Sequence, residues 1–370
     1  MKIGINALYI KWGVNAGTET YFTNIVKPWY EKKSLNIEFI MYCNDTPPWW
    51  QGEKKYFRIK LFPRTKSLKN RLFIEQVIFP ITLSKNINIL FNPGYVGSLF
   101  LKVPQVTTIH DGFAWVYPNE IGLLRSIYWK VFIPLTAKKA KKVIAVSKNT
   151  ANDIEKYCGI TKDNLEVIYE GGAHFVSSDD KTDLLQTYKI KSKSFFHCIG
   201  FFKEIKNPMR ILKAFEKFKL SHPSLNTKLL LAGHIGGKRA NDILELTKTI
   251  DDVIYVGRVS DNELVELYKN SLGLIFPSLY EGFGIPIIEA QSFGCPVVTS
   301  NISAMPEVAG GGAIIVDPLS IEEIENAFYE LVTKSSNKLI SRGFDNLKRF
   351  SWKKASQQTL EVLKSTYNYE

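Results

Sequence analysis

The chain has 370 residues, of which 45% are hydrophobic and 13% aromatic, and its formal net charge is +12. That length suits two domains, each with a core of its own. The four cysteines form no C-x-x-C pair and the five histidines show no ligand spacing. This pattern favours a reducing cytoplasm and argues against a disulfide framework or a zinc site. Nothing resembles a signal peptide, and no apolar stretch approaches the roughly 20 residues that span a bilayer.

Short β-branched segments alternate with helical patterns along the chain, which is typical of parallel sheets built from βαβ units. In the first half we predict strands at residues 2–10, 37–44, 56–62, 87–91, 105–110, 142–146 and 165–169. In the second half we predict strands at residues 195–200, 228–233, 253–257, 272–276, 297–300 and 313–316. The polar segment 177–183 is predicted to be a linker between a first domain of residues 1–176 and a second of residues 184–350.

Two loops of the first domain carry candidate site residues, because ligands of open α/β sheets bind beyond the carboxyl ends of the strands. In the loop after the first strand, Gly13 and Gly17 can bring backbone N–H groups close to a phosphate or to a second substrate, the acceptor. Thr18 is predicted to cap the helix that follows. The strand at residues 105–110 ends in His110, and an imidazole there can donate to a hydroxyl or stabilise developing charge. The alternative for His110 is a packed side chain that is bonded to backbone.

Positive charge is concentrated in the first half of the chain. Residues 1–175 carry 24 Lys and Arg against 13 Asp and Glu, and residues 51–150 alone carry 17 against 4. Such a surface can hold anionic lipid, at about 1 kcal/mol per well-placed cation, or nucleic acid, or it is simply a solvated face. No nucleic-acid motif accompanies the charge, so we expect no nucleic-acid partner.

The first strand of the second domain leads into a loop with two lysines, Lys203 and Lys206. Lys206 stands just ahead of Asn207-Pro208, which is typical of a helix cap followed by a first-turn proline. A cation there can neutralise a bound diphosphate, which is worth several kcal/mol in a dry site. The alternative is an ordinary surface lysine.

Residues 277–290 carry the densest set of candidates. A buried strand, two glycines and Pro286 in the first turn of a helix together predict a phosphate site, because free N–H groups and the helix dipole point at the anion. Glu281 and Glu289 bracket that site, and carboxylates accept hydrogen bonds from hydroxyls. Phosphate together with hydroxyls indicates a sugar nucleotide.

The run S-L-Y-E-G-F-G-I-P-I-I-E-A, followed by Gly294-Cys295-Pro296 and Pro306-Glu307-Val308, resembles the donor-site signature of family 4 retaining glycosyltransferases. The resemblance implies an α/β fold of the GT-B type, with two Rossmann-like parallel-sheet domains that face each other across a cleft. The first domain would bind the acceptor and the second the nucleotide sugar. A terminal helix after R-F-S-W, residues 351–370, would cross back to the first domain.

The same resemblance implies roles for individual residues. Glu281, His110 and Lys206 would be catalytic, and Glu289 would hold the ribose hydroxyls. Further substrate contacts would come from Gly282, Phe283, Gly284, Tyr280, Arg258, Gly13 and Gly17. Arg258 is equally well explained as a solvated loop cation. Relatives commonly carry an arginine where this chain has Phe201 or Ile205, and Lys203 is the candidate substitute.

The predicted reaction is transfer of a hexose from an NDP-sugar to a hydroxyl of a lipid-linked glycan, with retention of configuration. Similarity to bacterial O-antigen and capsule mannosyltransferases favours mannose and GDP-mannose. No D-x-D motif is present, so we expect neither a metal nor another cofactor. We expect the enzyme at the inner face of the cytoplasmic membrane, held on anionic lipid by its basic first domain. The alternatives are a non-catalytic sugar-nucleotide binder, suggested by the missing arginine, and a related two-domain sugar-nucleotide epimerase.

Overall fold

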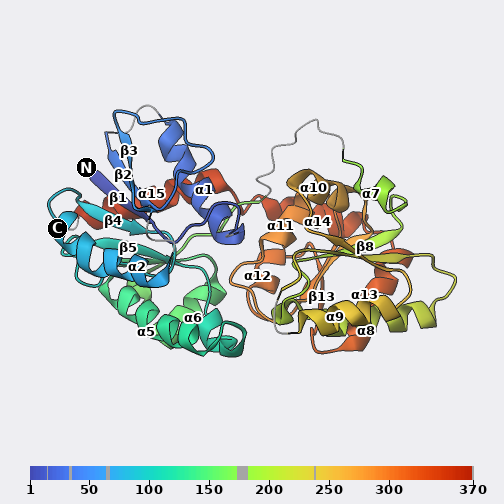
Figure 1. Cartoon of the computed structure of the whole chain (residues 1–370). Coiled ribbons are helices and arrows are strands. Elements are labelled where there is room, and N and C mark those ends of the chain that lie inside the picture. The colour runs from blue at the N-terminus through green and yellow to red at the C-terminus, as the bar shows by residue number, and fades with distance from the viewer. Residues whose placement is uncertain (15, 33–35, 64–66, 173–181, 237–238, 369–370) are drawn as a thin grey trace. The chain divides into compact units, whose positions relative to one another are not determined.

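The structure is a computed structural model that describes residues 1–14, 16–32, 36–63, 67–172, 182–236 and 239–368 (Figure 1). The chain divides into two compact units, which we call the first and second units. The first unit comprises Met1–Glu170 with Ser351–Glu370, and the second comprises Gly171–Phe350. Most of the predicted linker, residues 177–181, lies outside the described residues.

The first unit is built on a seven-stranded parallel sheet in the order β3-β2-β1-β4-β5-β6-β7. Its strands are β1 (Lys2–Ala7), β2 (Glu38–Cys43), β3 (Phe57–Leu61), β4 (Ile89–Asn92), β5 (Gln105–Ile109), β6 (Lys142–Ala145) and β7 (Leu165–Val167). β1, β4 and β5 are almost wholly buried, as expected for central strands that are covered on both faces.

The second unit has a six-stranded parallel sheet in the order β10-β9-β8-β11-β12-β13. Its strands are β8 (Phe195–Ile199), β9 (Lys228–Ala232), β10 (Val253–Gly257), β11 (Gly273–Phe276), β12 (Val297–Ser300) and β13 (Ile314–Val316). Each strand predicted from the sequence is present in the described chain. Several end earlier than predicted, and β1 stops at Ala7 rather than at residue 10.

Helices cover both faces of the first sheet (Figure 1). They are α1 (Ala16–Glu31), α2 (Leu68–Phe73), the π-helix η2 (Ile74–Ile78), α3 (Phe79–Thr82), α4 (Phe113–Val116), η3 (Pro118–Glu120), α5 (Leu123–Lys139), α6 (Lys148–Cys158), η4 (Lys162–Asn164) and α15 (Trp352–Asn368). The predicted return of the terminal helix to the first domain is confirmed, because α15 packs on α1. Trp29 Nε1 donates to Ser356 O at 3.3 Å, and Ser356 Oγ donates to Ile25 O at 2.7 Å.

In the second unit, α8, α9 and α13 cover one face of the sheet and α10, α11 and α14 the other (Figure 1). The helices are α7 (Leu184–Thr187), η5 (Glu204–Lys206), α8 (Pro208–Ser221), α9 (Ala240–Thr249), α10 (Asp261–Asn270), α11 (Ile285–Ser292), α12 (Met305–Ala309), α13 (Ile321–Thr333) and α14 (Asn337–Leu347). The predicted capping box of α10 is confirmed, with Ser260 and Glu263 bonded reciprocally. Among the described helices, none has the length and apolarity needed to cross a membrane.

One predicted cap is wrong, and a second is confirmed in its position but not in its hydrogen bond. Helix α1 begins at Ala16, so Thr18 lies inside its first turn rather than ahead of it. Asn207 does precede α8, but its side chain makes no cap hydrogen bond, because Asn207 is in the left-handed conformation at φ 63°. Its amide donates instead to two loops of the second unit, as described below.

Candidate active site

Two predicted catalytic residues, Lys206 and Glu281, are in direct contact in the second unit. Lys206 ends η5, which follows β8, and Glu281 lies in the loop after β11. Lys206 Nζ lies 2.5 Å from Glu281 Oε1 and 4.3 Å from the ring centroid of Phe276. Both side chains are mostly buried, with 16% and 17% exposed. The loops are also joined through backbone, since Leu279 N–H donates to Ile205 O at 2.7 Å. The pair therefore combines a cation and a carboxylate at the carboxyl edge of the sheet.

Ser303, which the sequence analysis did not single out, fixes the backbone of Glu281. The Glu281 N–H donates to Ser303 Oγ at 3.1 Å, and the Ser303 hydroxyl donates back to Glu281 O at 2.7 Å. Ser303 itself has φ 57°, a left-handed conformation that is uncommon for residues other than glycine. The one signal in the sequence was its place shortly after a predicted strand.

Asn207 connects the loop after β8 to two other loops of the same edge. Its side-chain amide donates to Pro277 O at 3.2 Å and to Pro318 O at 2.6 Å. Arg210 Nη1 in turn donates to Asn207 Oδ1 at 3.2 Å. These carbonyls lie in the loops after β11 and β13. One buried asparagine therefore fixes the positions of three loops relative to one another, including the one that carries Lys206. With its side chain engaged in this way, Asn207 occupies the N-cap position of α8 without making a cap hydrogen bond.

The second predicted carboxylate, Glu289, is held by a tyrosine. Glu289 lies on α11, is 5% exposed, and its Oε2 accepts a hydrogen bond from Tyr268 Oη at 2.9 Å. Burial is the main factor that raises the pKa of Tyr268 well above its usual value, and the charge of Glu289 is the second. The Tyr268 hydroxyl therefore stays protonated and donates to the carboxylate. Sequence reasoning missed Tyr268, because on α10 it has only the spacing of a core residue.

The glycine loop ahead of α11 has the conformation that the sequence required. Gly284 adopts φ 102° and forms the N-cap position, and a proline follows in the first turn. Phe283 is buried and meets Phe350 edge-on with ring centroids 5.6 Å apart. Gly282 is half-buried, and Tyr280 is buried at 5% exposure. The loop thus carries aromatic side chains inward beside Glu281, while the substrate contacts assigned to these residues stay a prediction.

Phe201, one of the two residues that stand where relatives carry an arginine, belongs to the hydrophobic core. Phe201 and Phe202 are 1% exposed, and Phe202 packs edge-on against Tyr255. An arginine at position 201 would place a charge in this apolar cluster at a high desolvation cost. Lys203 and Arg258, by contrast, are exposed residues of the loops after β8 and β10. Lys203 lies three residues before Lys206, so it stays the candidate substitute for the arginine of relatives.

In the first unit, His110 is packed rather than open. Its Nε2 lies 2.8 Å from Pro93 O, and a carbonyl oxygen only accepts, so this nitrogen carries the proton. Nδ1 lies 3.7 Å from Glu170 Oε1, and the Tyr21 ring stands edge-on to the imidazole at 4.7 Å. Burial raises the pKa of Glu170, and the neighbouring His110 ring acts in the opposite direction. These contacts fit the alternative of a packed histidine, and the catalytic role of His110 stays a prediction.

The glycine loop of the first unit is closed by a side chain of α1. Gly13 adopts φ 74°, and its N–H donates to Glu19 Oε2 at 2.8 Å. Gly17 lies in the first turn of α1, and a Cβ added there would meet no atom within 4 Å. Residue 15 lies outside the described residues. The Gly13 amide is therefore engaged within the loop, so a contact from it to a ligand would require Glu19 to move.

Comparison with known families assigns the chain. The profile of the family described as Glycosyltransferase Family 4 matches residues 20–171, and that of Glycosyl transferases group 1 matches residues 180–344. Together the two matches cover most of both units. The chain belongs to the family 4 glycosyltransferases. The predicted family and its GT-B class of fold are thereby confirmed.

Individual relatives and solved structures agree with this glycosyltransferase assignment. The chain is 28% identical to O-antigen chain mannosyltransferase B of Escherichia coli, over 70% of each chain. It is 27% identical to O-antigen chain mannosyltransferase RfbU of Salmonella typhimurium, over 66% of this chain and 67% of that protein. Among solved structures, Anabaena HepE in complex with UDP-glucose matches with a TM-score of 0.73 at 17% identity, covering 99% of this chain and all of that one. A glycosyltransferase from Rickettsia africae matches with a TM-score of 0.70 at 19% identity, covering 99% and 98%.

Proposed function

We propose that this glycosyltransferase transfers a hexose, with mannose favoured, from an NDP-sugar to a hydroxyl of a lipid-linked glycan, with retention of configuration. The observation that carries the proposal is the contact of Lys206 with Glu281, beside a carboxylate, Glu289, that Tyr268 orients. GDP-mannose is the favoured donor because relatives are named as O-antigen mannosyltransferases. A nucleotide-sugar donor is further supported by the complex of HepE with UDP-glucose. The product would enter surface polysaccharide synthesis.

The donor would bind at the carboxyl edge of the second sheet. Its diphosphate would take over the ammonium of Lys206 and lie at the N-terminus of α11, where N–H groups and the helix dipole favour an anion. Lys203 would supply the second cation in place of the arginine of relatives. Glu289 would accept hydrogen bonds from the ribose hydroxyls, while Glu281, released from Lys206, would accept from hydroxyls of the sugar.

Transfer would proceed on one face of the sugar. The bond between the anomeric carbon and the diphosphate oxygen breaks, and the acceptor oxygen forms its bond on the same face. The acceptor proton passes to an oxygen of the leaving diphosphate, so that no charge is left unbalanced. Lys206 stabilises the departing diphosphate, and Glu281 together with His110 supports the oxocarbenium-like state. This assignment requires no metal ion, because the cation and the N–H groups meet the diphosphate charge.

The partners follow from the same proposal. The acceptor would be a lipid-linked saccharide, and the basic first unit would hold the enzyme on anionic lipid at the inner face of the cytoplasmic membrane. Nucleic acid is not a partner in this scheme.

A donor screen followed by a turnover assay tests the proposal. Binding of a ligand to the native state raises the unfolding temperature, so GDP-mannose should raise it more than UDP-glucose or dTDP-glucose at equal concentration. Slow release of GDP from GDP-mannose should follow. Binding without any release would instead support the non-catalytic binder that the apolar Phe201 and Ile205 suggest. Return of an intact NDP-sugar with altered stereochemistry would support an epimerase.

A further inference from the structure

Helix α5 of the first unit has an apolar face turned to water. Its buried residues Ile133 and Ala137 face the core. On the opposite side Leu124, Ile127 and Val131 are exposed, with Leu124 84% exposed, and Leu135 continues the row one turn later. The side of a helix that faces water is normally polar. The spacing of three to four residues makes this a continuous stripe along most of the helix.

The neighbouring segment α2–η2–α3 has a second stripe of the same kind. Phe73, Val77 and Ile81 are exposed at intervals of four residues, with Ile81 72% exposed. On the inner side of this segment Glu75 and Phe79 are buried. The π-helical turn between residues 74 and 78 keeps the outer positions nearly aligned, because it widens the turn beyond that of an α-helix.

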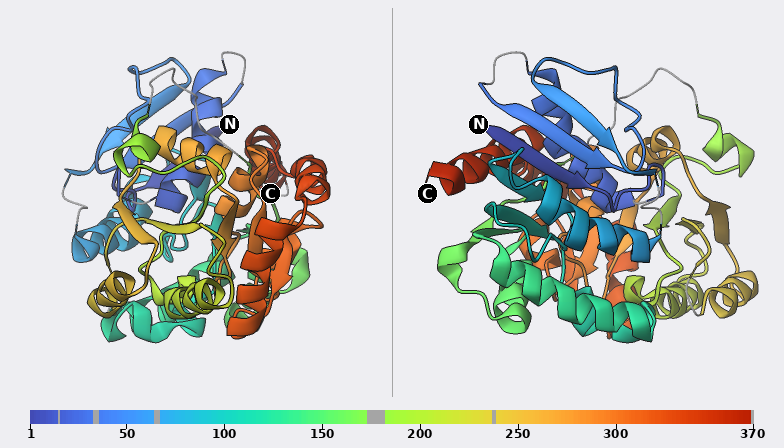
Figure 2. Two further views of the ribbon diagram at one scale, coloured as in Figure 1. Left: turned by 90° about the vertical axis from the view of Figure 1, so that its right-hand side faces the viewer. Right: turned by 60° about the vertical axis from the view of Figure 1, so that its left-hand side comes forward.

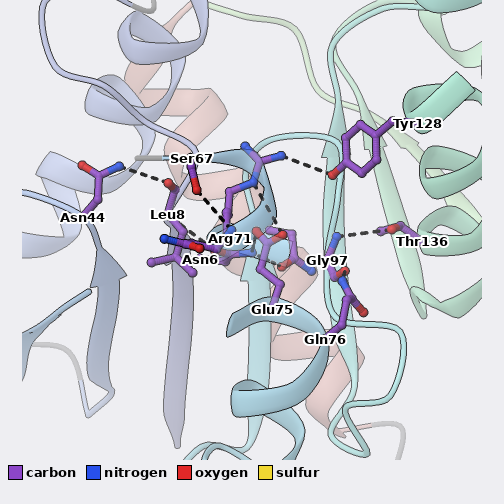
Figure 3. Close-up of polar contacts among 12 residues, drawn as sticks. Asn6, Leu8, Asn44, Ser67, Arg71, Glu75, Gln76, Gly97, Tyr128 and Thr136 are labelled. Atoms are coloured by element: carbon purple, nitrogen blue, oxygen red, sulfur yellow. Dashed lines mark hydrogen bonds and ion pairs between the residues drawn. The ribbon is translucent and has the colours of Figure 1, made fainter. Parts of the chain in front are cut away.

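A buried polar network fixes the two segments to one another and to the sheet (Figure 3). Arg71 Nη2 donates to Tyr128 Oη on α5 at 3.2 Å, and Arg71 Nε lies 3.6 Å from Glu75 Oε2. Asn6 Nδ2 on β1 donates to Glu75 Oε1 at 3.1 Å. Figure 2, right, shows α2 and α5 as neighbouring helices over the same face of the sheet. The two stripes are therefore presented together, on a rigid support.

The exposed charged residues of these two segments are all basic. Residues 54–110 contain one acidic residue, Glu75, which is buried, and residues 121–152 contain none. Lys69 on α2 and Lys130, Lys138 and Lys139 on α5 are exposed. The nearest acidic residue ahead of α5, Glu120, is half-buried. Apolar side chains bordered by cations, with no accessible carboxylate on either segment, match the boundary between acyl chains and anionic headgroups.

We propose that the outer faces of α2–η2–α3 and α5, which we call the α2/α5 surface, dock on a bilayer that contains anionic lipids. The proposal rests on the proposed lipid-linked acceptor, which would place the substrate at such a bilayer. Helix α5, with 17 residues, is about 25 Å long, so it can lie in the interface plane over its whole length. The apolar stripes enter the headgroup boundary, and the lysines contact the lipid phosphates.

Vesicle co-sedimentation of the full chain tests the proposal. The wild-type protein should bind vesicles of phosphatidylcholine with phosphatidylglycerol at least about tenfold more tightly than vesicles of phosphatidylcholine alone, and high salt should weaken that binding. The double variant Leu124→Gln with Ile127→Gln keeps the charge and should bind at least about tenfold more weakly. The triple variant Lys130→Gln, Lys138→Gln and Lys139→Gln should lose the preference for phosphatidylglycerol.

The matched control is Leu220→Gln with Leu319→Gln, two exposed leucines of the second unit, which should bind vesicles like the wild type. Equal binding by the Leu124/Ile127 variant and the wild type would overturn the proposal, as would a wild type that ignores vesicles. Self-association in solution that only the Leu124/Ile127 variant abolishes, without vesicle binding, would assign the surface to a second copy instead. Release of NDP from the donor reports on the proposed function separately, and the Leu124/Ile127 variant should retain it.

Discussion

At the scale of single residues, the candidate active site of the second unit is organised by paired polar groups rather than by isolated ones. Lys206 neutralises Glu281 at 2.5 Å, and Tyr268 donates to Glu289 at 2.9 Å. Each pair contains at least one predicted site residue. Without its partner, that residue would leave a poorly solvated charge in a largely buried position. In the proposed mechanism, the pairing would keep the site stable without donor, and the paired groups would change partner when a diphosphate and hydroxyls bind.

Removing either member of the Lys206–Glu281 pair should abolish transfer. In the proposed mechanism, Lys206→Ala removes the cation that stabilises the departing diphosphate, and Glu281→Ala removes the hydrogen-bond acceptor for sugar hydroxyls. We expect kcat/KM to fall at least about a hundredfold in both, by analogy with loss of one electrostatic contact to a transition state. The measurement is steady-state release of NDP, with circular dichroism as evidence of folding. Lys213→Ala, at an exposed position of α8, is the matched control. Two folded variants with wild-type turnover would refute both roles.

Tyr268 should act on donor affinity through Glu289. Tyr268→Phe keeps the ring in its buried position and removes only the hydroxyl that orients the carboxylate. A hydrogen bond to a charged group contributes about 1.5–3 kcal/mol, so the KM for the donor should rise about tenfold or more while kcat changes little. Tyr329→Phe, on the exposed side of α13, provides the comparison. An unchanged KM with a lowered unfolding temperature would show that Tyr268 is only structural.

At the scale of elements, α15 completes the core of the first unit from the far end of the sequence. It is the neighbour of α1, and its inner side buries Ala355, Leu360 and Leu363. Ser356 and Trp29 join the two helices by hydrogen bonds in both directions. Because the contact joins residues more than 300 positions apart, the first unit depends on the end of the chain for its stability.

Leu363→Ala should destabilise the first unit by about 2–5 kcal/mol, because Leu363 has no exposed surface and its removal leaves a cavity. All seven tryptophans, at positions 12, 29, 49, 50, 115, 129 and 352, belong to the first unit. Tryptophan fluorescence during urea unfolding therefore reports on that unit alone. Lys364→Ala, exposed on the same helix, should change the free energy of unfolding by less than about 0.5 kcal/mol. Equal effects of the two substitutions would contradict the packing.

Strand β8 carries a buried histidine that should make the second unit sensitive to acid. Burial lowers the pKa of His197 from 6.5 to about 3. The unfolded chain therefore binds a proton that the folded one does not, and stability is lost as the pH falls from about 6.5 towards 3. The slope from one such group is up to about 1.4 kcal/mol per pH unit. His197→Asn should flatten the pH dependence by that amount in hydrogen exchange of β8 amides. A parallel pH profile of wild type and variant would show that His197 does not contribute.

At the scale of the whole molecule, the two halves of the chain differ in charge. Of the formal net charge of +12, residues 1–175 carry +11, and the remaining residues carry 24 basic against 23 acidic side chains, or +1. A nearly neutral second half suits the proposed binding of a small anionic donor by the two local cations Lys203 and Lys206. The basic first half suits contact with an extended anionic surface, which is the basis of the docking proposal for the α2/α5 surface.

Donor cleavage should not depend on a divalent cation. The chain has no D-x-D motif, and in the proposed mechanism Lys206 and N–H groups meet the diphosphate charge. Excess EDTA should therefore leave the rate of NDP release within about twofold of the untreated enzyme, which is less than the effect of losing one weak interaction. Recovery of a lost activity by Mg²⁺ or Mn²⁺ after EDTA would contradict the mechanism.

Much of the architecture follows from the sequence alone. Apolar runs bounded by glycine and polar residues placed most strands of both sheets, because a parallel strand that is buried on both faces is largely apolar. The loop at residues 277–290 was recognisable for a local reason as well, since Gly284 and Pro286 meet backbone requirements of a strand–turn–helix that few other residues satisfy. The family followed from the same run of residues.

The pairing of side chains was decided only by the tertiary structure. Lys206 and Glu281 are 75 residues apart, Tyr268 and Glu289 are 21 apart, and Ser303 and Glu281 are 22 apart. A pattern of types and spacings fixes which elements form, but not which side chains meet where their ends converge. Asn207 is the clearest example, because its local sequence is that of a helix cap while its amide bonds to loops 70 and 111 residues away. Long-range hydrogen bonds of this kind depend on the packing of whole strands, which no local pattern records.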